Sequence, residues 1–333
     1  MNILIRLTAI TLVFISTTAH SQTAKNQKIV VYTHRNAQLI QPLFDEYKKQ
    51  TGITIEFLTG EPGALIQKIK AEGKSTPADI FISVDAGTLW EADQQKLFAA
   101  TESKILTDRV PENYRSQNKT WFGLSLRART IFFNKEKVKA TDLVSYADLA
   151  EPKWKGKLCL RTSKKVYNQS LVAMMIASQG EEQTKNVVTG WIKNLAYPVF
   201  DNDTKLLEAI AKGGCPIGIA NTYYLGKLQK EGKAKNVGVY FPSPTHLNIS
   251  GGGILQHSKN KKMAQEFLEW LTTDTAQKLF ADSNLEYPIV PNIPADSIVQ
   301  AWGTPVSSEK FQISQAGELQ RKAIMLIDSV KYE

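Results

Sequence analysis

Apolar positions in the first third of the chain recur with two different periods. Continuous or alternating apolar runs at 28–32, 53–57 and 79–84 predict strands. Between these runs, apolar residues return every three or four positions, which predicts helices over 39–51 and 64–71. This alternation of strands with helices favours an α/β fold with a mainly parallel sheet.

The rest of the chain continues this alternation and contains one long apolar strand. Strands are predicted at 124–133, 156–161 and 216–220, and helices at 169–178, 181–194, 204–212, 263–271 and 309–330. The run over 124–133 is long enough to cross between two lobes, and no flexible linker is found. Because a length of 333 residues suggests two domains or lobes, we predict two lobes joined by crossing strands.

Two further segments are interpreted as structural. Gly251, Gly252 and Gly253 lack the lysine and the helix signal of a phosphate-binding loop, so they predict a close approach of the backbone at a lobe crossing. Phe267 and Trp270 share one face of an amphipathic helix, which indicates core packing rather than a docking patch.

Residues 1–21 have the features of a secretory signal peptide. Arg6 supplies a short basic region, residues 7–15 are almost entirely apolar, and Ala19-His20-Ser21 places small residues around a cleavage site. A membrane anchor is the alternative, but a spanning helix needs about 20 apolar residues and this stretch is shorter. We therefore expect the chain from residue 22 onward to be exported to the periplasm in soluble form, without stable membrane insertion.

The composition is that of a folded globular protein with a basic surplus. Charged residues make up 22% and hydrophobic residues 42%, and 41 Lys and Arg against 32 Asp and Glu give a net charge of +9. The basic residues are spread along the chain without the motifs of nucleic-acid-binding proteins, so no nucleic acid partner is expected. They either form a solvated surface or attract an anionic ligand, such as a metal held by citrate or carbonate.

Motifs of the common enzyme classes are absent from the sequence. The chain has no G-x-S-x-G, H-E-x-x-H, phosphate-loop or dinucleotide-binding pattern. His34, His246 and His257 are too widely spaced to predict a zinc site, so no catalytic residue is assigned. Cys159 and Cys215 are the only cysteines, and an even pair in an exported chain predicts a disulfide bond.

Three tyrosines lie in segments that resemble those of a known family. Tyr167 lies in VYNQSLVAMMI, and Tyr223 and Tyr224 lie in GIANTYYLGKL. A lone tyrosine is usually a half-buried packing residue. These segments, together with HLNISGGGIL, LRARTIFFNK and SNLEYPIVP, resemble the ferric-iron-binding proteins of bacterial ABC uptake systems. The resemblance covers essentially the whole chain after the signal peptide, and the adjacent tyrosine pair is its most specific part.

The resemblance implies a type II periplasmic binding protein fold, in which two α/β lobes close on a ligand. The implied lobes are discontinuous, with 22–125 and 248–285 in the first and 126–247 and 286–333 in the second. The implied function is that of a monomeric carrier, not an enzyme, which captures Fe³⁺ outside the inner membrane and delivers it to an ABC permease.

The implied metal ligands are Tyr167, Tyr223 and Tyr224, which match the tyrosine ligands of the family. Fe³⁺ is a small, hard, highly charged ion that prefers anionic oxygen. A free phenol has a pKa of about 10 and is neutral at pH 7, but a bound cation of this charge favours the phenolate. Three phenolates would neutralise Fe³⁺ in formal charge, whereas carboxylate sites suit Ca²⁺ or Mg²⁺ and thiolate or imidazole sites suit softer metals.

The loop after the first predicted strand departs from the family pattern. Where many relatives carry a His-Tyr pair, this chain has Asn36 and Ala37, and His34 lies two residues out of register. The resemblance therefore implies that the first lobe supplies no ligand and that carbonate or another small synergistic anion completes the iron coordination. The opposite cleft wall is predicted to include His34, Arg35, Asn36 and Glu61.

Arg127 and Arg129 are the predicted anion-binding residues. A guanidinium binds a planar oxyanion through two parallel hydrogen bonds, and residues two apart on a strand face the same side. An interlobe salt bridge is the alternative role for these arginines. Two alternative functions also stay open: the same fold with an oxyanion, polyamine or sugar as cargo, and an exported enzyme on this scaffold.

Overall fold

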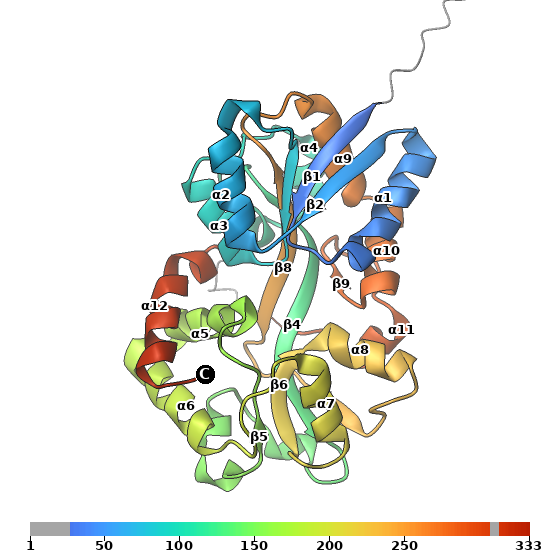
Figure 1. Ribbon diagram of the computed structural model, residues 1–333. Coiled ribbons are helices and arrows are strands. Elements are labelled where there is room, and N and C mark those ends of the chain that lie inside the picture. The colour runs from blue at the N-terminus through green and yellow to red at the C-terminus, as the bar shows by residue number, and fades with distance from the viewer. Residues whose placement is uncertain (1–26, 307–312) are drawn as a thin grey trace, which may run out of the picture.

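One mixed sheet runs through the molecule and connects two lobes, the first at the top and the second at the bottom of Figure 1. The computed structural model describes residues 27–306 and 313–333, so the predicted signal peptide lies outside the described residues. The strands are β1 (Lys28–Thr33), β2 (Thr54–Thr59), β3 (Ile80–Ser83), β4 (Phe122–Asn134), β5 (Leu158–Cys159), β6 (Ile217–Asn221), β7 (Val237–Tyr240), β8 (His246–Ile254) and β9 (Tyr287–Pro288). Their order is β2-β1-β3-β8-β4-β6-β5, with β7 and β9 paired to β4.

The sheet is parallel only toward its two edges. Strand β1 is parallel to β2 and β3, and β5 is parallel to β6. The long central strands β4 and β8 are antiparallel to each other and to their outer neighbours β6 and β3. The expectation of a mainly parallel sheet was therefore wrong for the centre, because the chain enters the second lobe along β4 and returns along β8.

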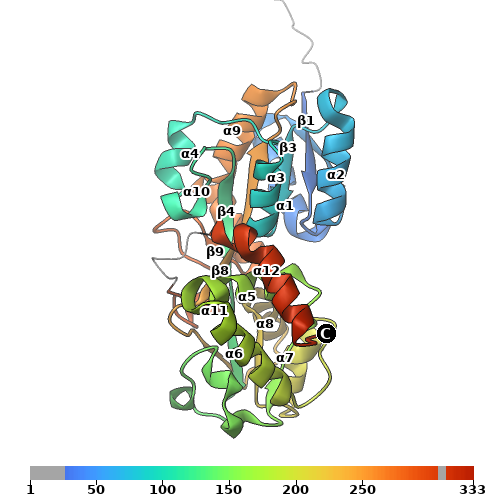
Figure 2. The same cartoon turned by 90° about the vertical axis from the view of Figure 1, so that its left-hand side faces the viewer.

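Helices cover the sheet in both lobes of the molecule (Figures 1 and 2). They are α1 (Ala37–Thr51), α2 (Pro62–Glu72), α3 (Ala86–Gln94), α4 (Lys104–Arg109), α5 (Val166–Gln179), α6 (Glu181–Lys193), α7 (Asp203–Ala211), α8 (Thr222–Lys230), α9 (Lys261–Leu271), α10 (Asp274–Asn284), α11 (Ser297–Gln300) and α12 (Gln315–Ser329). The predicted helices are confirmed to within a few residues at their ends, except that the part of 309–330 before residue 313 lies outside the described residues.

The predicted strand over 156–161 shrinks to the two residues of β5. Beyond Cys159 the chain forms only an isolated bridge, between Arg161 and Phe200. The predicted disulfide is confirmed, since the Cys159 and Cys215 sulfurs are 2.01 Å apart. This bond joins β5 to the residues just before β6 and closes a loop of 56 residues in the second lobe.

The two lobes have separate hydrophobic cores, which lie toward opposite ends of the crossing strands. The core of the first lobe includes Phe44, Phe81 and Phe267, which confirms that Phe267 is a core residue. Trp270 packs against the same core and donates its indole N–H to the Gln50 side chain. The second lobe has its own buried clusters, to which α12 contributes as it packs along α5 (Figure 2). The exact lobe boundaries predicted from the sequence stay a prediction.

The glycines of β8 lie where the backbone of β4 and the preceding loop approach closely. A Cβ atom on Gly253 would stand 2.3 Å from the Thr120 carbonyl oxygen, and one on Gly251 would stand 2.8 Å from the Phe122 carbonyl oxygen. Both distances are below any tolerable contact, so only glycine fits. The predicted backbone approach at the lobe crossing is confirmed, and it lets β8 pass between β3 and β4.

Candidate metal centre

Tyr223 and Tyr224 lie in the first turn of α8, directly after β6. Asn221 is the last residue of β6 and the N-cap of α8, and its backbone is extended. Its side-chain oxygen accepts a hydrogen bond from the Arg129 guanidinium at 3.4 Å, which ties this turn to β4. The rings of Tyr223 and Tyr224 stand with their centroids 4.3 Å apart. The strand-to-helix turn therefore presents two adjacent phenols at the carboxyl end of β6.

Tyr167 reaches the same place from the first turn of α5. Tyr167 and Tyr224 both lie close enough to Tyr223 to raise the pKa of its phenol. All three tyrosines line one cavity of about 250 Å³. Because β5 and β6 are parallel neighbours, the segments that follow them both start at the carboxyl ends of these strands and so lie close together. This arrangement brings together the three predicted metal ligands, all of which come from helices of the second lobe.

The Tyr167 and Tyr223 phenols are neutral when no cation is bound. Burial raises the pKa of Tyr223 well above its ordinary value of 10, with the neighbouring tyrosines adding to the effect. Burial also raises the pKa of Tyr167, although the Arg127 guanidinium acts in the opposite direction. A cation that binds as a phenolate complex must therefore displace protons, so its affinity is expected to fall as the pH falls.

Arg127 lies at this cavity without a carboxylate partner. Its side chain is 2% exposed, and its guanidinium carbon stands 5.6 Å from the centre of the Tyr167 ring. Its Nη1 donates to the Ser250 hydroxyl at 3.2 Å, whereas its buried Nη2 has no hydrogen-bond partner. Within 27–306 and 313–333, no salt bridge involves Arg127. An unpaired guanidinium beside three phenols is suited to hold an anion.

Arg129 lies away from this cavity although it is only two residues along β4. Its Nε donates to the Asn168 side chain at 2.7 Å, and its Nη1 forms a salt bridge of 3.4 Å with Asp203 on α7. These contacts lie within the second lobe, so they are not the interlobe salt bridge considered as an alternative. The anion-binding role of Arg129 stays a prediction, and its donors already have partners.

Arg161 is a site residue that sequence reasoning missed. It forms a salt bridge of 3.0 Å with Asp203 and lies 5.5 Å from the centre of the Tyr167 ring. It also lies close enough to Tyr224 for the two side chains to interact electrostatically. Its position in the chain could have indicated this role. Arg161 follows β5, and residues that follow the parallel strands β5 and β6 lie together at the carboxyl ends of these strands.

The predicted opposite wall is divided between two adjoining cavities. His34, Arg35 and Asn36 line the cavity of the tyrosines, whereas Glu61 lines a neighbouring cavity of about 280 Å³ that shares His34 and Tyr167. The Asn36 side chain accepts from the backbone N–H of Gln38 and so caps α1. Arg35 forms a buried salt bridge of 2.8 Å with Glu286, which the sequence did not indicate as a cleft residue. Burial lowers the pKa of His34, which favours the neutral imidazole.

Comparison with known proteins identifies the family. Residues 42–305 match the model of a bacterial extracellular solute-binding protein. The chain belongs to this family. Iron uptake protein A1 of Synechocystis sp. is a relative that is 38% identical over 289 residues, which cover 84% of this chain and 80% of that protein.

Solved structures of such solute-binding proteins share the fold. A Trichodesmium protein described as IdiA or FutA in complex with iron and citrate ligands has 39% identity and a TM-score of 0.86, and the match covers 92% of this chain and all of that one. The apo ferric ion-binding protein A of Pasteurella haemolytica has 36% identity and a TM-score of 0.86, over 92% of this chain and 98% of that one. These matches confirm the predicted family, the two-lobed fold and the prediction that the chain is a binding protein rather than an enzyme.

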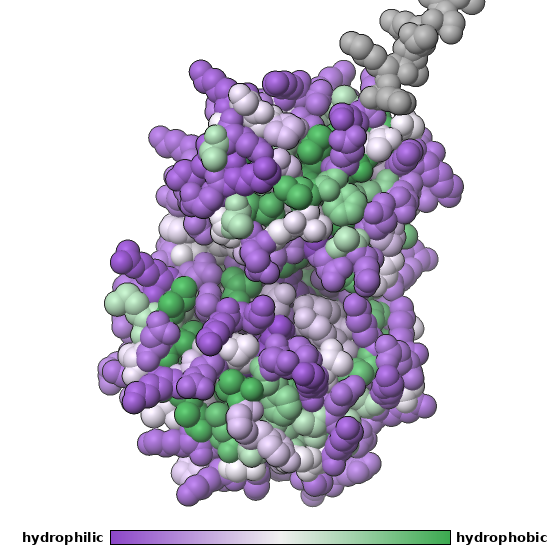
Figure 3. Space-filling view, viewed as in Figure 1, coloured by the Kyte–Doolittle hydropathy of each residue, from purple (hydrophilic) through white to green (hydrophobic). Residues whose placement is uncertain are grey.

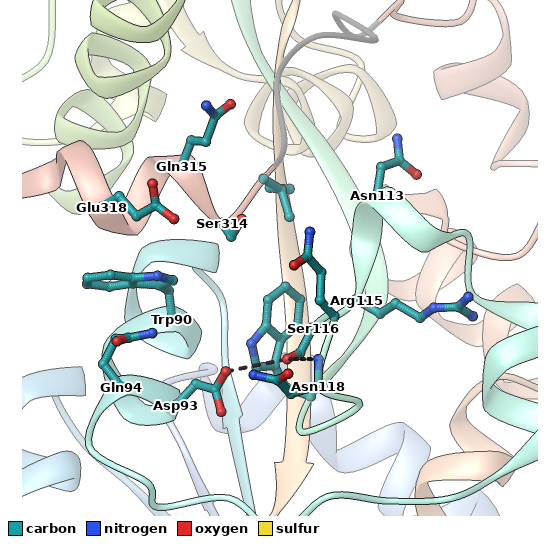
Figure 4. A pocket seen from close by; sticks show the side chains of 13 residues that line it. Trp90, Asp93, Gln94, Asn113, Arg115, Ser116, Asn118, Ser314, Gln315 and Glu318 are labelled. Atoms are coloured by element: carbon teal, nitrogen blue, oxygen red, sulfur yellow. Dashed lines mark hydrogen bonds between the residues drawn. The ribbon is translucent and has the colours of Figure 1, made fainter.

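Other features of the described residues were compared with this site. A cavity of about 350 Å³ lies between α3, the loop over 113–118 and the start of α12, with Asp93 and Glu318 beside Trp90 (Figure 4). No tyrosine lines it, and the described residues contain no group of three or more His, Cys, Asp or Glu side chains that could hold a metal ion. On the face shown in Figure 3, hydrophilic side chains cover much of both lobes, which meet at a waist. No helix in the described part of the chain is long and apolar enough to span a membrane.

His246 on β8 is expected to make the protein less stable in acid. Its side chain is buried, both ring nitrogens lack partners, and burial with the nearby Arg129 and Arg127 lowers its pKa to about 3. Because an unfolded histidine titrates near 6.5, the unfolded chain binds the proton first as the pH falls. Between pH 7.5 and 5.0, wild type is therefore expected to lose about 2 kcal/mol more unfolding free energy than His246→Gln. Urea unfolding of both proteins at the two pH values measures this difference, and equal losses would contradict it.

Proposed function

We propose that this protein is a periplasmic carrier that binds Fe³⁺ through Tyr167, Tyr223 and Tyr224 and delivers it to an ABC permease. The observation that carries the proposal is the meeting of three tyrosines in one cavity beside an unpaired guanidinium. The name of the Synechocystis relative and the iron complex of the Trichodesmium structure support the choice of metal. Export by the predicted signal peptide and a monomeric state are parts of the same proposal.

The donor set favours Fe³⁺ over softer or less charged ions. Three phenolates carry three negative charges, so they balance Fe³⁺ and leave no charge on the metal and its protein ligands. Arg127 then remains as a buried positive charge at the cavity. A small anion such as carbonate would bind this guanidinium and occupy coordination positions that the tyrosines leave open. The anion would thus bind both the metal and Arg127.

A polyamine cargo fits this cavity poorly. Polyamines are multivalent cations that need several carboxylates around aromatic walls. Among the described residues that line the cavity, Glu286 is the only carboxylate, and it is already paired with Arg35. Arg127 and Lys227 line the same space and would repel a cation.

Titration of the iron-free protein with ferric citrate tests the proposed function. Phenolate bound to Fe³⁺ gives a charge-transfer band in the visible spectrum, and we expect this band to saturate at about one iron per chain. A parallel titration with Zn²⁺ gives no such band and serves as the control for nonspecific metal uptake. Absence of the band, with no iron retained after gel filtration, would overturn the assignment of the tyrosines as iron ligands.

A further inference from the structure

Two arginines and one glutamate meet at the tyrosine cavity, and only one of the arginines is paired. Arg35 lies in the loop after β1, Arg127 lies on β4, and Glu286 immediately precedes β9. The Arg35 Nη2 stands 2.8 Å from the Glu286 Oε1, and the two side chains are 1% and 5% exposed. Among these three side chains, one positive charge is therefore left without a partner, on Arg127.

A single serine hydroxyl holds the two guanidiniums close together. The Ser250 Oγ accepts from the Arg35 Nη1 at 2.5 Å and from the Arg127 Nη1 at 3.2 Å. Glu286 therefore lies within the same buried network as Arg127, and its second oxygen accepts from the Ser125 hydroxyl on β4. A buried carboxylate in the same network as a free guanidinium would normally bind it.

We propose that Arg35 is a positioning residue that holds Glu286 away from Arg127 and so keeps Arg127 available for the anion of the cargo. This inference rests on the proposed function, because it concerns the anion that accompanies Fe³⁺. Without Arg35, Glu286 would be free to pair with Arg127 and would compete with the incoming anion for the same N–H donors. The Arg35–Glu286 pair thereby sets the preference of this cavity for an iron complex that brings its own negative charge.

The test measures bicarbonate binding to the iron-loaded protein. Protein loaded with Fe³⁺ is transferred to carbonate-free buffer and titrated with bicarbonate, while the position of the phenolate-to-iron band is recorded. Arg35→Met is expected to bind bicarbonate roughly tenfold to a hundredfold more weakly than wild type, because an unpaired buried carboxylate now competes. The double variant Arg35→Met/Glu286→Gln, which lacks both charges, is expected to recover to within about threefold of wild type.

Recovery in the double variant separates this role from a direct contact between Arg35 and the anion. If the double variant binds bicarbonate as weakly as Arg35→Met, or if Arg35→Met binds it as wild type does, the inference is overturned. Arg109→Met is the matched control, since Arg109 pairs with Asp274 on the first lobe away from the cavity, and it should behave as wild type. Thermal unfolding verifies that each variant is folded.

The same experiment distinguishes failure of the inference from failure of the proposed function. A wild-type protein without a phenolate-to-iron band would overturn the proposed function, and the inference with it. A wild-type protein that shows the band and shifts it with bicarbonate, while Arg35→Met does the same at equal bicarbonate concentration, overturns only the role of Arg35.

Discussion

Replacement of Tyr223 by phenylalanine is expected to weaken Fe³⁺ binding by more than about a hundredfold, since loss of a ligand should exceed the effect of losing a supporting residue. Tyr223 interacts with both of the other tyrosines, each of which raises its pKa. Phe keeps the ring that packs against Tyr224 but removes the oxygen that would bind the metal. Iron retention after gel filtration and the intensity of the visible band measure the loss.

The matched control for this variant is Tyr197→Phe. Tyr197 is 46% exposed and belongs to the second lobe, outside the tyrosine cavity. We expect Tyr197→Phe to bind iron as wild type does, and Tyr223→Phe to unfold at a temperature close to that of wild type. Equal iron affinities in Tyr223→Phe, Tyr167→Phe and wild type would refute the ligand assignment.

Asp203→Asn is expected to lower the unfolding free energy by about 3–5 kcal/mol, which is typical when one partner of a buried ion pair is removed. Asp203 is completely buried and is the shared carboxylate of Arg161, at 3.0 Å, and Arg129, at 3.4 Å. Asn preserves the shape of the side chain but leaves both guanidiniums without a negative partner. Urea unfolding of the iron-free protein measures the change.

Asp201→Asn provides the control for the loss of a carboxylate near the same helix. Asp201 pairs with Lys205 on the surface, where side-chain exposures of 69% and 61% allow water and salt to screen the pair. Little change in stability is expected there. A small effect of Asp203→Asn as well would mean that water or a neighbouring group compensates the two arginines.

Asp203 also couples stability to the candidate metal centre. Arg161 lies over the Tyr167 ring and interacts electrostatically with Tyr224, so its position affects two of the three proposed ligands. The cationic neighbours of the tyrosines therefore have different partners, with Arg161 tied to Asp203 and Arg127 unpaired. This difference is the reason that we assign the anion to Arg127.

Local patterns in the chain were sufficient to predict most helices and strands. The period of the apolar residues set the first strands and helices, because each of these elements buries one face against the same core. The helix α8 was not predicted, since its nine residues contain two tyrosines and three lysine or glutamine residues rather than a clear apolar stripe. The central antiparallel pair of β4 and β8 also escaped prediction, because strand direction depends on how the chain returns between lobes.

The sequence by itself determined the disulfide, because the chain has only two cysteines and both lie after the predicted signal peptide. The candidate ligands Tyr167, Tyr223 and Tyr224 came from the resemblance of their segments to ferric-iron-binding proteins, which also needs only the sequence. Only the tertiary structure decided which arginine is free. Arg127, Arg129 and Arg161 have the same charge, but Asp203 reaches two of them and Arg35 occupies Glu286. Such pairing depends on which distant side chains meet in space, because the energy of a buried charge is set by its nearest partners and not by its neighbours along the chain.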